Sequence, residues 1–206
     1  MYGIDVSKWN GAIDWNKVKA DGKDFAIVKI TNKSNQMEES FFGNALGATF
    51  AGLPIGGYKY VYAKNVTQAK SEAKALVNVL RGVTMPCGVW LDMEDESLRG
   101  LGKATLTKII NAEAEILRAA GYKVGIYCNL DWYKNVLDSK NLPYVFWIAR
   151  YPSGDNGTVK ESLSPLGMDK VGAWQYSSKG KVNGIKGNVD LNVTKVNLIE
   201  VMNIFG

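Results

Sequence analysis

Residues 88–94 read GVWLDME, and the segments on both sides of them indicate the fold class. Apolar residues recur at helical spacings across residues 66–80 before this stretch and across residues 106–117 after it, so each segment is expected to bury one face. Residues 88–94 are themselves a short apolar run introduced by Pro86, a pattern that favours a buried strand. A strand between two such helices predicts a parallel sheet.

The same alternation extends outward in both directions. Strands are predicted at residues 2–6, 25–31, 55–62, 88–94, 123–128, 144–149, 171–176 and 188–192. Residues 152–170 carry Gly, Ser, Pro and Asp without a helical pattern, so the last three strands lack full crossover helices. Eight strands without a linker or repeat predict one domain over residues 1–206, an irregular closed barrel of the α/β class that ends in a helix over residues 193–204.

The composition excludes several kinds of chemistry. The chain has no histidine, which excludes Ser-His-Asp and Cys-His catalysis and a histidine-ligated zinc ion. Acid–base work is then left to carboxylates, Lys, Tyr or Cys. The formal net charge of +5 comes without a long run of like charges, which is typical of simple solubility or of weak attraction to an anionic surface. No basic-aromatic motif is visible, so no nucleic-acid partner is predicted.

The two cysteines are predicted to be free. Cys87 lies just before one predicted strand and Cys128 at the end of the next, so parallel neighbours would hold the thiols at opposite ends of the sheet. A five-residue strand is roughly 16 Å long, whereas a disulfide needs Cα atoms within about 7 Å of each other. Both thiols are therefore expected to be unpaired and mostly buried.

The N-terminus and the apolar runs bear on the cellular location. No apolar run of about 18 residues or more occurs, so no membrane span is expected. The N-terminus lacks a basic region followed by an apolar run, so no signal peptide is expected in this chain.

Two carboxylates share one face of the predicted strand at residues 88–94. Because side chains alternate along a strand, Asp92 and Glu94 point the same way. They lie at the C-terminal end of a predicted barrel strand, where barrel enzymes keep their catalytic residues. Two other interpretations stay open: solvation of a strand end, which the following Asp95 and Glu96 fit, and a magnesium or calcium site.

Further acidic and aromatic residues are expected around this pair. Asp5 ends the first strand and Asp190 lies in the last, and a closed barrel places those strands side by side. Aromatic side chains that can stack on sugar faces are predicted at Tyr58, Tyr60 and Tyr62 on the third strand and at Trp147 and Trp174 on later strands. Core packing is the alternative for each aromatic. Lys29 and Gln175 are weaker candidates, which could instead face a helix.

The order of several short motifs resembles that of a known family. Residues 3–11 read GIDVSKWNG and residues 13–15 read IDW, which resembles the opening of the glycoside hydrolase family 25 muramidases. Later family motifs are matched in order by residues 25–29 (FAIVK), 57–63 (GYKYVYA), 91–94 (LDME), 174–177 (WQYS), 184–185 (GI) and 189–192 (VDLN). Each piece is weak alone, but the ordered set covers nearly the whole chain.

The resemblance implies a fold and an activity. The fold would be an irregular TIM-like barrel with five β/α units followed by three strands with few helices. The activity would be hydrolysis of the β-1,4 bond between N-acetylmuramic acid and N-acetylglucosamine in bacterial cell-wall peptidoglycan, with no cofactor and no metal ion. The protein would act at the cell wall or outside the cell, without membrane insertion, after phage-type release or removal of a leader.

Residue roles follow from the same resemblance. Glu94 would be the general acid and base, and Asp92 would stabilise the developing positive charge or orient the acetamido group of the substrate. Asp5 and Asp190 would complete the acidic floor, and Tyr62 would lie close to the reacting sugar. The substrate would also contact Tyr58, Tyr60, Trp147, Trp174 and Gln175.

Spacing along the strand leaves the stereochemistry open. Residues two apart are about 6.6 Å apart along a strand, while carboxyl separations are about 5–5.5 Å in retaining enzymes and 6.5–9.5 Å in inverting ones. The resemblance favours retention. Two other functions remain possible on the residues alone: a non-catalytic glycan-binding barrel, and a metal-dependent barrel hydrolase with Asp92, Glu94 and Asp190 as ligands.

Overall fold

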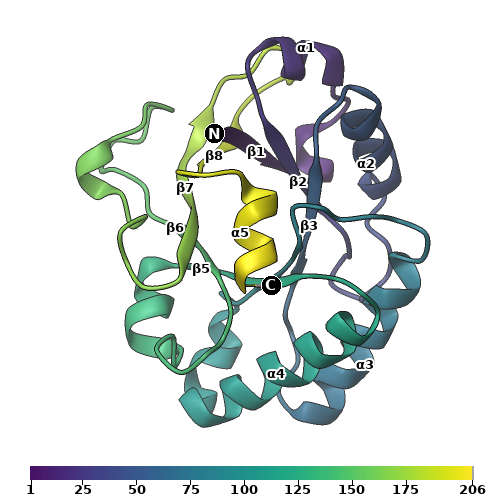
Figure 1. The fold of residues 1–206 in the computed structure, drawn as a ribbon, viewed down its shortest axis with the longest axis vertical. Coiled ribbons are helices and arrows are strands. Elements are labelled where there is room, and N and C mark those ends of the chain that lie inside the picture. Colours follow the sequence, from purple (N-terminus) through teal and green to yellow (C-terminus); the bar gives the residue numbers. More distant parts are fainter. Residues whose placement is uncertain (206) are drawn as a thin grey trace.

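Eight strands close into a barrel in which neighbours in sequence are neighbours in space (Figure 1). The computed structural model describes residues 1–205. The strands are β1 (Tyr2–Val6), β2 (Phe25–Lys29), β3 (Ile55–Tyr60), β4 (Val89–Asp92), β5 (Val124–Asn129), β6 (Phe146–Ala149), β7 (Val171–Gly180) and β8 (Val189–Val193). Neighbours from β1 to β7 run parallel, whereas β8 is antiparallel to both β7 and β1. The predicted barrel is confirmed. The antiparallel direction of the last strand was not predicted from the sequence.

The connections after the first five strands contain helices or helical turns, whereas the connection from β6 to β7 contains one short turn. The helices and short helical turns are η1 (Lys8–Asn10), α1 (Trp15–Ala20), α2 (Phe41–Phe50), α3 (Val66–Val79), η2 (Glu96–Leu101), α4 (Lys103–Ala119), η3 (Trp132–Val136), η4 (Glu161–Leu163) and α5 (Leu198–Phe205). Only η4 lies between β6 and β7. The predicted series of five β/α units followed by three strands with few helices is therefore confirmed.

Some element boundaries differ from the prediction. β3 ends at Tyr60 and β4 at Asp92, so Tyr62 and Glu94 lie in the segments that follow these strands. β7 continues to Gly180 because its second half pairs with the antiparallel β8. The last helix begins at Leu198 instead of residue 193, because Val193 still pairs with its neighbouring strands.

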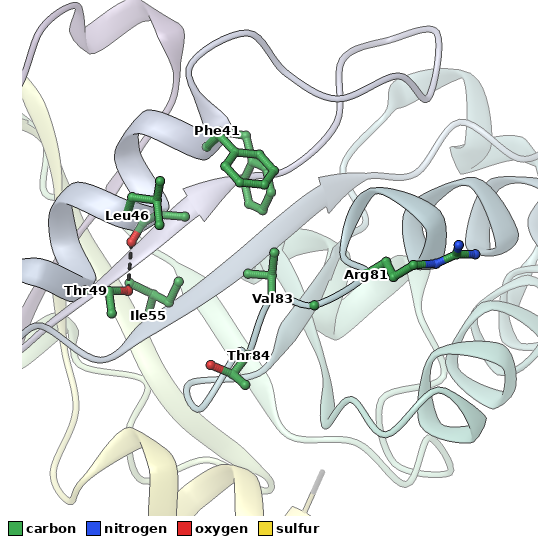
Figure 2. Close-up of a pocket in the computed structure, with 10 residues that line it drawn as sticks. Phe41, Leu46, Thr49, Ile55, Arg81, Val83 and Thr84 are labelled. Atoms are coloured by element: carbon green, nitrogen blue, oxygen red, sulfur yellow. Dashed lines mark hydrogen bonds between the residues drawn. The ribbon is translucent and has the colours of Figure 1, made fainter.

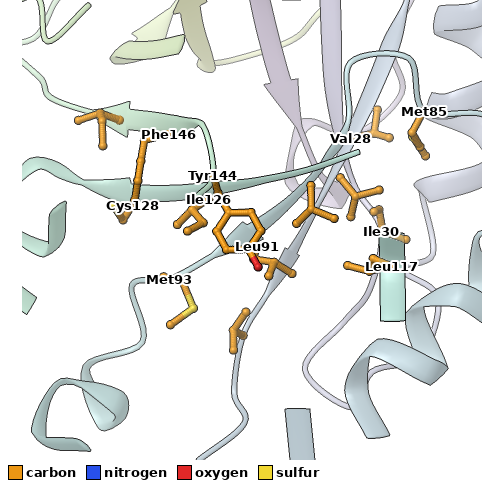
Figure 3. Close-up of a cluster of buried hydrophobic side chains, with 14 of the residues drawn as sticks. Val28, Ile30, Met85, Leu91, Met93, Leu117, Ile126, Cys128, Tyr144 and Phe146 are labelled. Carbon is orange, nitrogen blue, oxygen red and sulfur yellow. The ribbon is translucent and has the colours of Figure 1, made fainter. Parts of the chain in front are cut away.

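Alternation along the strands separates an outer and an inner apolar layer. Leu91 and Ile126 belong to the outer layer, between the strands and the helices (Figure 3). Trp90 and Trp147 belong to the inner layer and fill the barrel. Gly125 is the register partner of Trp90, and a Cβ atom at this position would lie 2.4 Å from the indole ring. A glycine at position 125 therefore leaves room for the indole ring of Trp90.

Helix α5 closes the N-terminal end of the barrel. Its residues Leu198, Val201 and Met202 belong to the same buried cluster as the barrel interior. Gly88, directly before β4, lies so close that a Cβ atom there would be 2.2 Å from the Met202 side chain. Apolar side chains therefore plug this end of the barrel.

A buried ion cluster joins β3 to two helices. Lys59 points away from the barrel interior, is fully buried, and donates to Glu72 of α3 and to both carboxylate oxygens of Glu113 of α4, the latter at 3.1 Å. Burial raises the pKa of Glu113 to about 7, against the opposing effect of Lys59. The backbone N–H of Tyr62 also donates to Glu72, at 3.4 Å. The cluster therefore ties the segment after β3 to the helical layer.

The thiols behave as predicted. Cys87 and Cys128 are both free and buried. Burial raises the pKa of the Cys87 thiol to about 12 and lifts that of Cys128 well above its ordinary value. Among residues 1–205, no helix has the length and apolar character needed to cross a membrane.

Candidate active site

A cavity of about 380 Å³ opens at the C-terminal end of the parallel strands. It is lined by Asp5, Tyr58, Asp92, Glu94, Tyr127, Trp147, Tyr151, Gln175, Ser178 and Asp190. These residues come from every strand except β2, or from the segments directly after the strands. Four of them are carboxylic acids, so the cavity gathers titratable groups in a partly buried space.

A second hollow, of about 210 Å³, lies outside the barrel between α2 and the segment that follows α3 (Figure 2). Its wall is mostly apolar and includes Phe41, Leu46 and Ile55. Arg81 is the one ionisable residue among those that line it. Because it has no acid or base pair, we take the acidic cavity as the candidate active site.

Asp92 and Glu94 differ in how deeply they lie. Asp92 is the last residue of β4 and is only 3% exposed, whereas Glu94 is partly exposed at the mouth. Burial, followed by the charge of Glu94, raises the pKa of Asp92 well above its usual value, and Lys29 opposes this. Burial and then Asp190 raise the pKa of Glu94, again against Lys29. The Oδ1 atom of Asp92 has no hydrogen-bond partner within residues 1–205.

Asp5 and Asp190 form a second acidic pair. They are register partners on the antiparallel strands β1 and β8. Burial raises the pKa of Asp5 to about 6, although hydrogen bonds from Asn192 and Gln175 lower it. Burial, and then the charge of Asp5, raises the pKa of Asp190 to about 8. At neutral pH the pair is therefore expected to hold one proton.

Two amide side chains donate hydrogen bonds to Asp5. Gln175 Nε2 and Asn192 Nδ2 each donate to Asp5 Oδ2 at 2.8 Å. The oxygen of Gln175 accepts from the hydroxyl groups of Tyr127 and Tyr151. The hydrogen-bonding groups of Gln175 are thus already engaged within the protein.

Aromatic rings form one wall of the cavity. The Trp147 ring centroid lies 4.4 Å from that of Tyr127 and 6.4 Å from that of Tyr58. The Lys29 ammonium lies 5.6 Å from the Tyr58 ring centroid. Such a wall offers apolar ring faces beside polar groups, which suits a sugar. Among residues 1–205, no three His, Cys, Asp or Glu side chains are grouped so that they could hold a metal ion.

Comparison with known sequences identifies the family. The sequence profile described as Glycosyl hydrolases family 25 matches residues 4–185. The chain belongs to glycosyl hydrolase family 25. The predicted family is therefore confirmed. The predicted enzyme class, glycoside hydrolase, is confirmed with it.

Similar proteins bear lysozyme names. The chain is 32% identical over 194 residues to the autolytic lysozyme of Clostridium acetobutylicum, covering 93% of this chain and 55% of that protein. It is 30% identical over 205 residues to lysozyme M1 of Streptomyces globisporus, covering 93% of this chain and 67% of that protein. The crystal structure of the bacterial lysozyme from Streptomyces coelicolor matches with a TM-score of 0.78 and 26% identity, covering 100% of this chain and 98% of that one.

The family 25 barrel brings together most of the predicted site residues. Those that line the cavity are Asp5, Tyr58, Asp92, Glu94, Trp147, Gln175 and Asp190. Tyr60 and Tyr62 do not line it but continue the row from Tyr58, with their ring centroids 4.9 Å apart. Trp174 is turned away: it is fully buried in the outer layer, where its indole N–H donates to the carbonyl of Arg150 at 2.9 Å. On β7 the neighbouring Gln175 faces inward, so Trp174 must face outward.

Four residues at the family 25 site fall outside the sequence-based prediction: Tyr127, Tyr151, Ser178 and Asn192. Alternation could have indicated one of them, because Asn192 lies two residues from Asp190. Tyr127 is the register partner of Asp92, which only the pairing of β4 with β5 reveals. Tyr151 lies in the irregular segment after β6, which has no periodicity to mark it. Asp155 ties this segment to β7 by accepting from the Ser177 hydroxyl at 2.6 Å and from the Ser178 backbone N–H at 2.8 Å.

Proposed function

We propose that the chain is a peptidoglycan hydrolase that cleaves the β-1,4 bond between N-acetylmuramic acid and N-acetylglucosamine at the bacterial cell wall. The main observation behind this proposal is the pair Asp92 and Glu94, two carboxyl groups whose pKa is raised. Asp92 is buried, and Glu94 lies at the mouth of the cavity. Glycoside hydrolysis uses two carboxyl groups in distinct environments. The lysozyme names of the similar proteins support this choice of substrate.

Glu94 is the proton donor in this proposal. Its partial exposure lets it meet a glycosidic oxygen, and its pKa, raised mainly by burial, favours the protonated form that a general acid needs. The proton passes from the Glu94 carboxyl to the glycosidic oxygen as the bond from that oxygen to C1 of the muramic acid breaks. The N-acetylglucosamine end leaves with a free hydroxyl group.

Asp92 orients the internal nucleophile. Its Oδ1 atom, unpartnered within residues 1–205, can accept the N–H of the substrate's acetamido group. This hydrogen bond turns the acetamido oxygen toward C1, with which it forms a bond as the leaving group departs. Glu94, now ionised, takes a proton from a water molecule whose oxygen attacks C1 and reopens the ring. The acid is regenerated, and the configuration at C1 is retained.

Substitution of Glu94 by Gln tests the proposal. Reducing-end release from purified peptidoglycan is expected to fall about 10²- to 10⁴-fold, because an amide has no acidic proton to donate. Glu96→Gln is the matched control, since Glu96 is an exposed acid two residues away that pairs with Arg99. Full activity of Glu94→Gln would overturn the role of Glu94.

The same assay separates the other functions. Wall binding by the unaltered protein without reducing-end release on several peptidoglycans would indicate a glycan-binding barrel. Loss of activity in the presence of a chelator would indicate the metal-dependent hydrolase. Release that is insensitive to chelator and lost only in Glu94→Gln is the expected result.

A further inference from the structure

One oxygen of Asp5 is held by two amide donors from different strands. Gln175 Nε2 of β7 and Asn192 Nδ2 of β8 both donate to Oδ2, each at 2.8 Å. All three side chains are nearly or completely buried, at 5%, 2% and 0% exposure respectively. An oxygen that accepts two buried N–H donors is a poor site for a proton, because hydrogen bonds to the charged form of a carboxylate favour that form.

The orientation of each amide is itself determined. Trp147 Nε1 lies 2.8 Å from Asn192 Oδ1, and an indole nitrogen can only donate, so the NH₂ group of Asn192 must face Asp5. The oxygen of Gln175 accepts from the hydroxyl groups of Tyr127 and Tyr151. With Gln175 reversed, its carbonyl oxygen would face the carboxylate of Asp5. Hydrogen bonds from Trp147, Tyr127 and Tyr151 therefore orient both NH₂ groups toward Asp5.

We propose that this amide clamp, formed by Gln175 and Asn192, keeps Asp5 ionised and places the shared proton of the acidic pair on Asp190. Asp5 is then a hydrogen-bond acceptor toward its register partner, and Asp190 is a neutral carboxylic acid that lines the cavity. The order of the pKa values agrees, because that of Asp5 is raised to about 6 and that of Asp190 to about 8. Gln175, Asn192, Tyr127 and Tyr151 are thus positioning residues that act through Asp5.

Other titratable groups face the pair. They are Asp92 and Glu94 at the end of β4, Tyr58 of β3, Tyr127 of β5, and Tyr151 and Asp155 after β6. The acids among them disfavour a second negative charge on the pair, and the tyrosines are neutral near pH 7 because burial raises their pKa. Glu94 disfavours a charge on Asp5 and Asp155 disfavours one on Asp190, whereas the two amide donors of the clamp act on Asp5 alone.

A neutral Asp190 has a consequence for the proposed hydrolysis, and this step rests on that function. Asp190 offers the substrate an O–H donor instead of a second full charge. A neutral Asp190 raises the pKa of Glu94 less than an ionised one would, so burial remains the main cause of that shift.

The location of the proton can be measured without substrate. Carbon-detected NMR of the Asp side-chain carboxyl groups, followed from pH 4 to pH 10, would assign the two steps of the pair. In the unaltered protein, Asp5 is expected to be ionised by pH 7 and Asp190 to titrate at the higher step. The opposite assignment would overturn the proposal, whatever the outcome for peptidoglycan hydrolysis.

Variants test whether the clamp causes this order. In Gln175→Leu, and in the double variant Tyr127→Phe with Tyr151→Phe, the Asp5 step is expected to rise by about one pH unit through loss of a hydrogen bond to a charged group. Tyr151→Phe alone should change it little, since Tyr127 still orients the amide. Tyr144→Phe is the matched control, because its hydroxyl donates to the amide oxygen of Asn111 outside the cavity. An unchanged Asp5 titration in folded Gln175→Leu would overturn the role of the clamp; if that variant does not fold, the tyrosine double variant decides.

Discussion

Lys59 of β3 and Glu113 of α4 meet between the barrel and its helices, where the ammonium nitrogen lies 3.1 Å from both carboxylate oxygens and both side chains are fully buried. Glu72 of α3 completes the cluster. A buried ion pair contributes little net stability compared with an apolar pair, but removal of one partner leaves an uncompensated buried charge. Removal of the cation from this cluster is therefore expected to lower the free energy of unfolding.

Lys59→Met is expected to lower the free energy of unfolding by about 3–5 kcal/mol, because two buried carboxylates lose their cation. Urea denaturation at pH 7 measures this change. Lys64→Met, at an exposed lysine shortly after β3, should stay within about 0.5 kcal/mol of the unaltered protein. A loss below about 1 kcal/mol for Lys59→Met would show that the cluster tolerates an unpaired charge.

Asp92→Asn is expected to lower kcat about 10²- to 10³-fold with a smaller effect on KM, because orientation of the acetamido group matters most when charge develops at C1. Initial rates of reducing-end release over a range of peptidoglycan concentrations provide both constants. Asp95→Asn is the control, since Asp95 does not line the cavity and its side chain caps the short turn η2 by accepting from the Ser97 N–H. Equal kcat values for the two variants would remove Asp92 from the mechanism.

The acidic pair predicts how stability depends on pH. The folded-state pKa values of Asp5 and Asp190 are raised from 3.8 to about 6 and about 8, so the folded chain binds more protons than the unfolded one between about pH 4 and pH 8. The free energy of unfolding should therefore fall as pH rises through this window. Asp190→Asn, which resembles the protonated acid, should flatten the fall and be more stable than the unaltered protein at pH 8 by roughly 1–3 kcal/mol.

Urea denaturation at pH 4, 6 and 8 checks this dependence. Asp169→Asn provides the matched control, because Asp169 is an exposed acid away from the cavity. Identical pH profiles for the unaltered protein and Asp190→Asn would mean that the pair does not hold a proton on folding.

Tyr58 and Trp174 should respond differently to substitution, although both were candidates for sugar contact. Tyr58→Ala is expected to raise KM about three- to tenfold, since an aromatic contact contributes about 0.5–1.5 kcal/mol. Trp174→Phe should leave KM within about twofold but lower stability by about 1–3 kcal/mol, because the carbonyl of Arg150 loses its buried donor. Steady-state kinetics and urea denaturation on both variants separate the two effects. A large KM change in Trp174→Phe would contradict the outward orientation.

The succession of strands and helices could be predicted from residue spacing alone. Helical and strand periodicities depend on neighbours a few positions away, so they were visible around residues 88–94 and through the first five β/α units. The common face of Asp92 and Glu94 followed from alternation along one strand. The absence of histidine already limited acid–base chemistry to a few residue types. All of these are local or compositional properties.

Barrel closure decided the rest, because it joins residues that are distant in the chain. A closed barrel was expected to place the strands of Asp5 and Asp190 side by side, but the register that pairs these two residues depends on the antiparallel last strand, which no local pattern marks. The register of β7 with β8 shifts near Gln175, and the faces of this strand place Gln175 against Asp5 and Trp174 among the outer apolar side chains. Hydrogen-bond partners and burial set the charge of each acid. Both come from segments that meet only when the barrel closes.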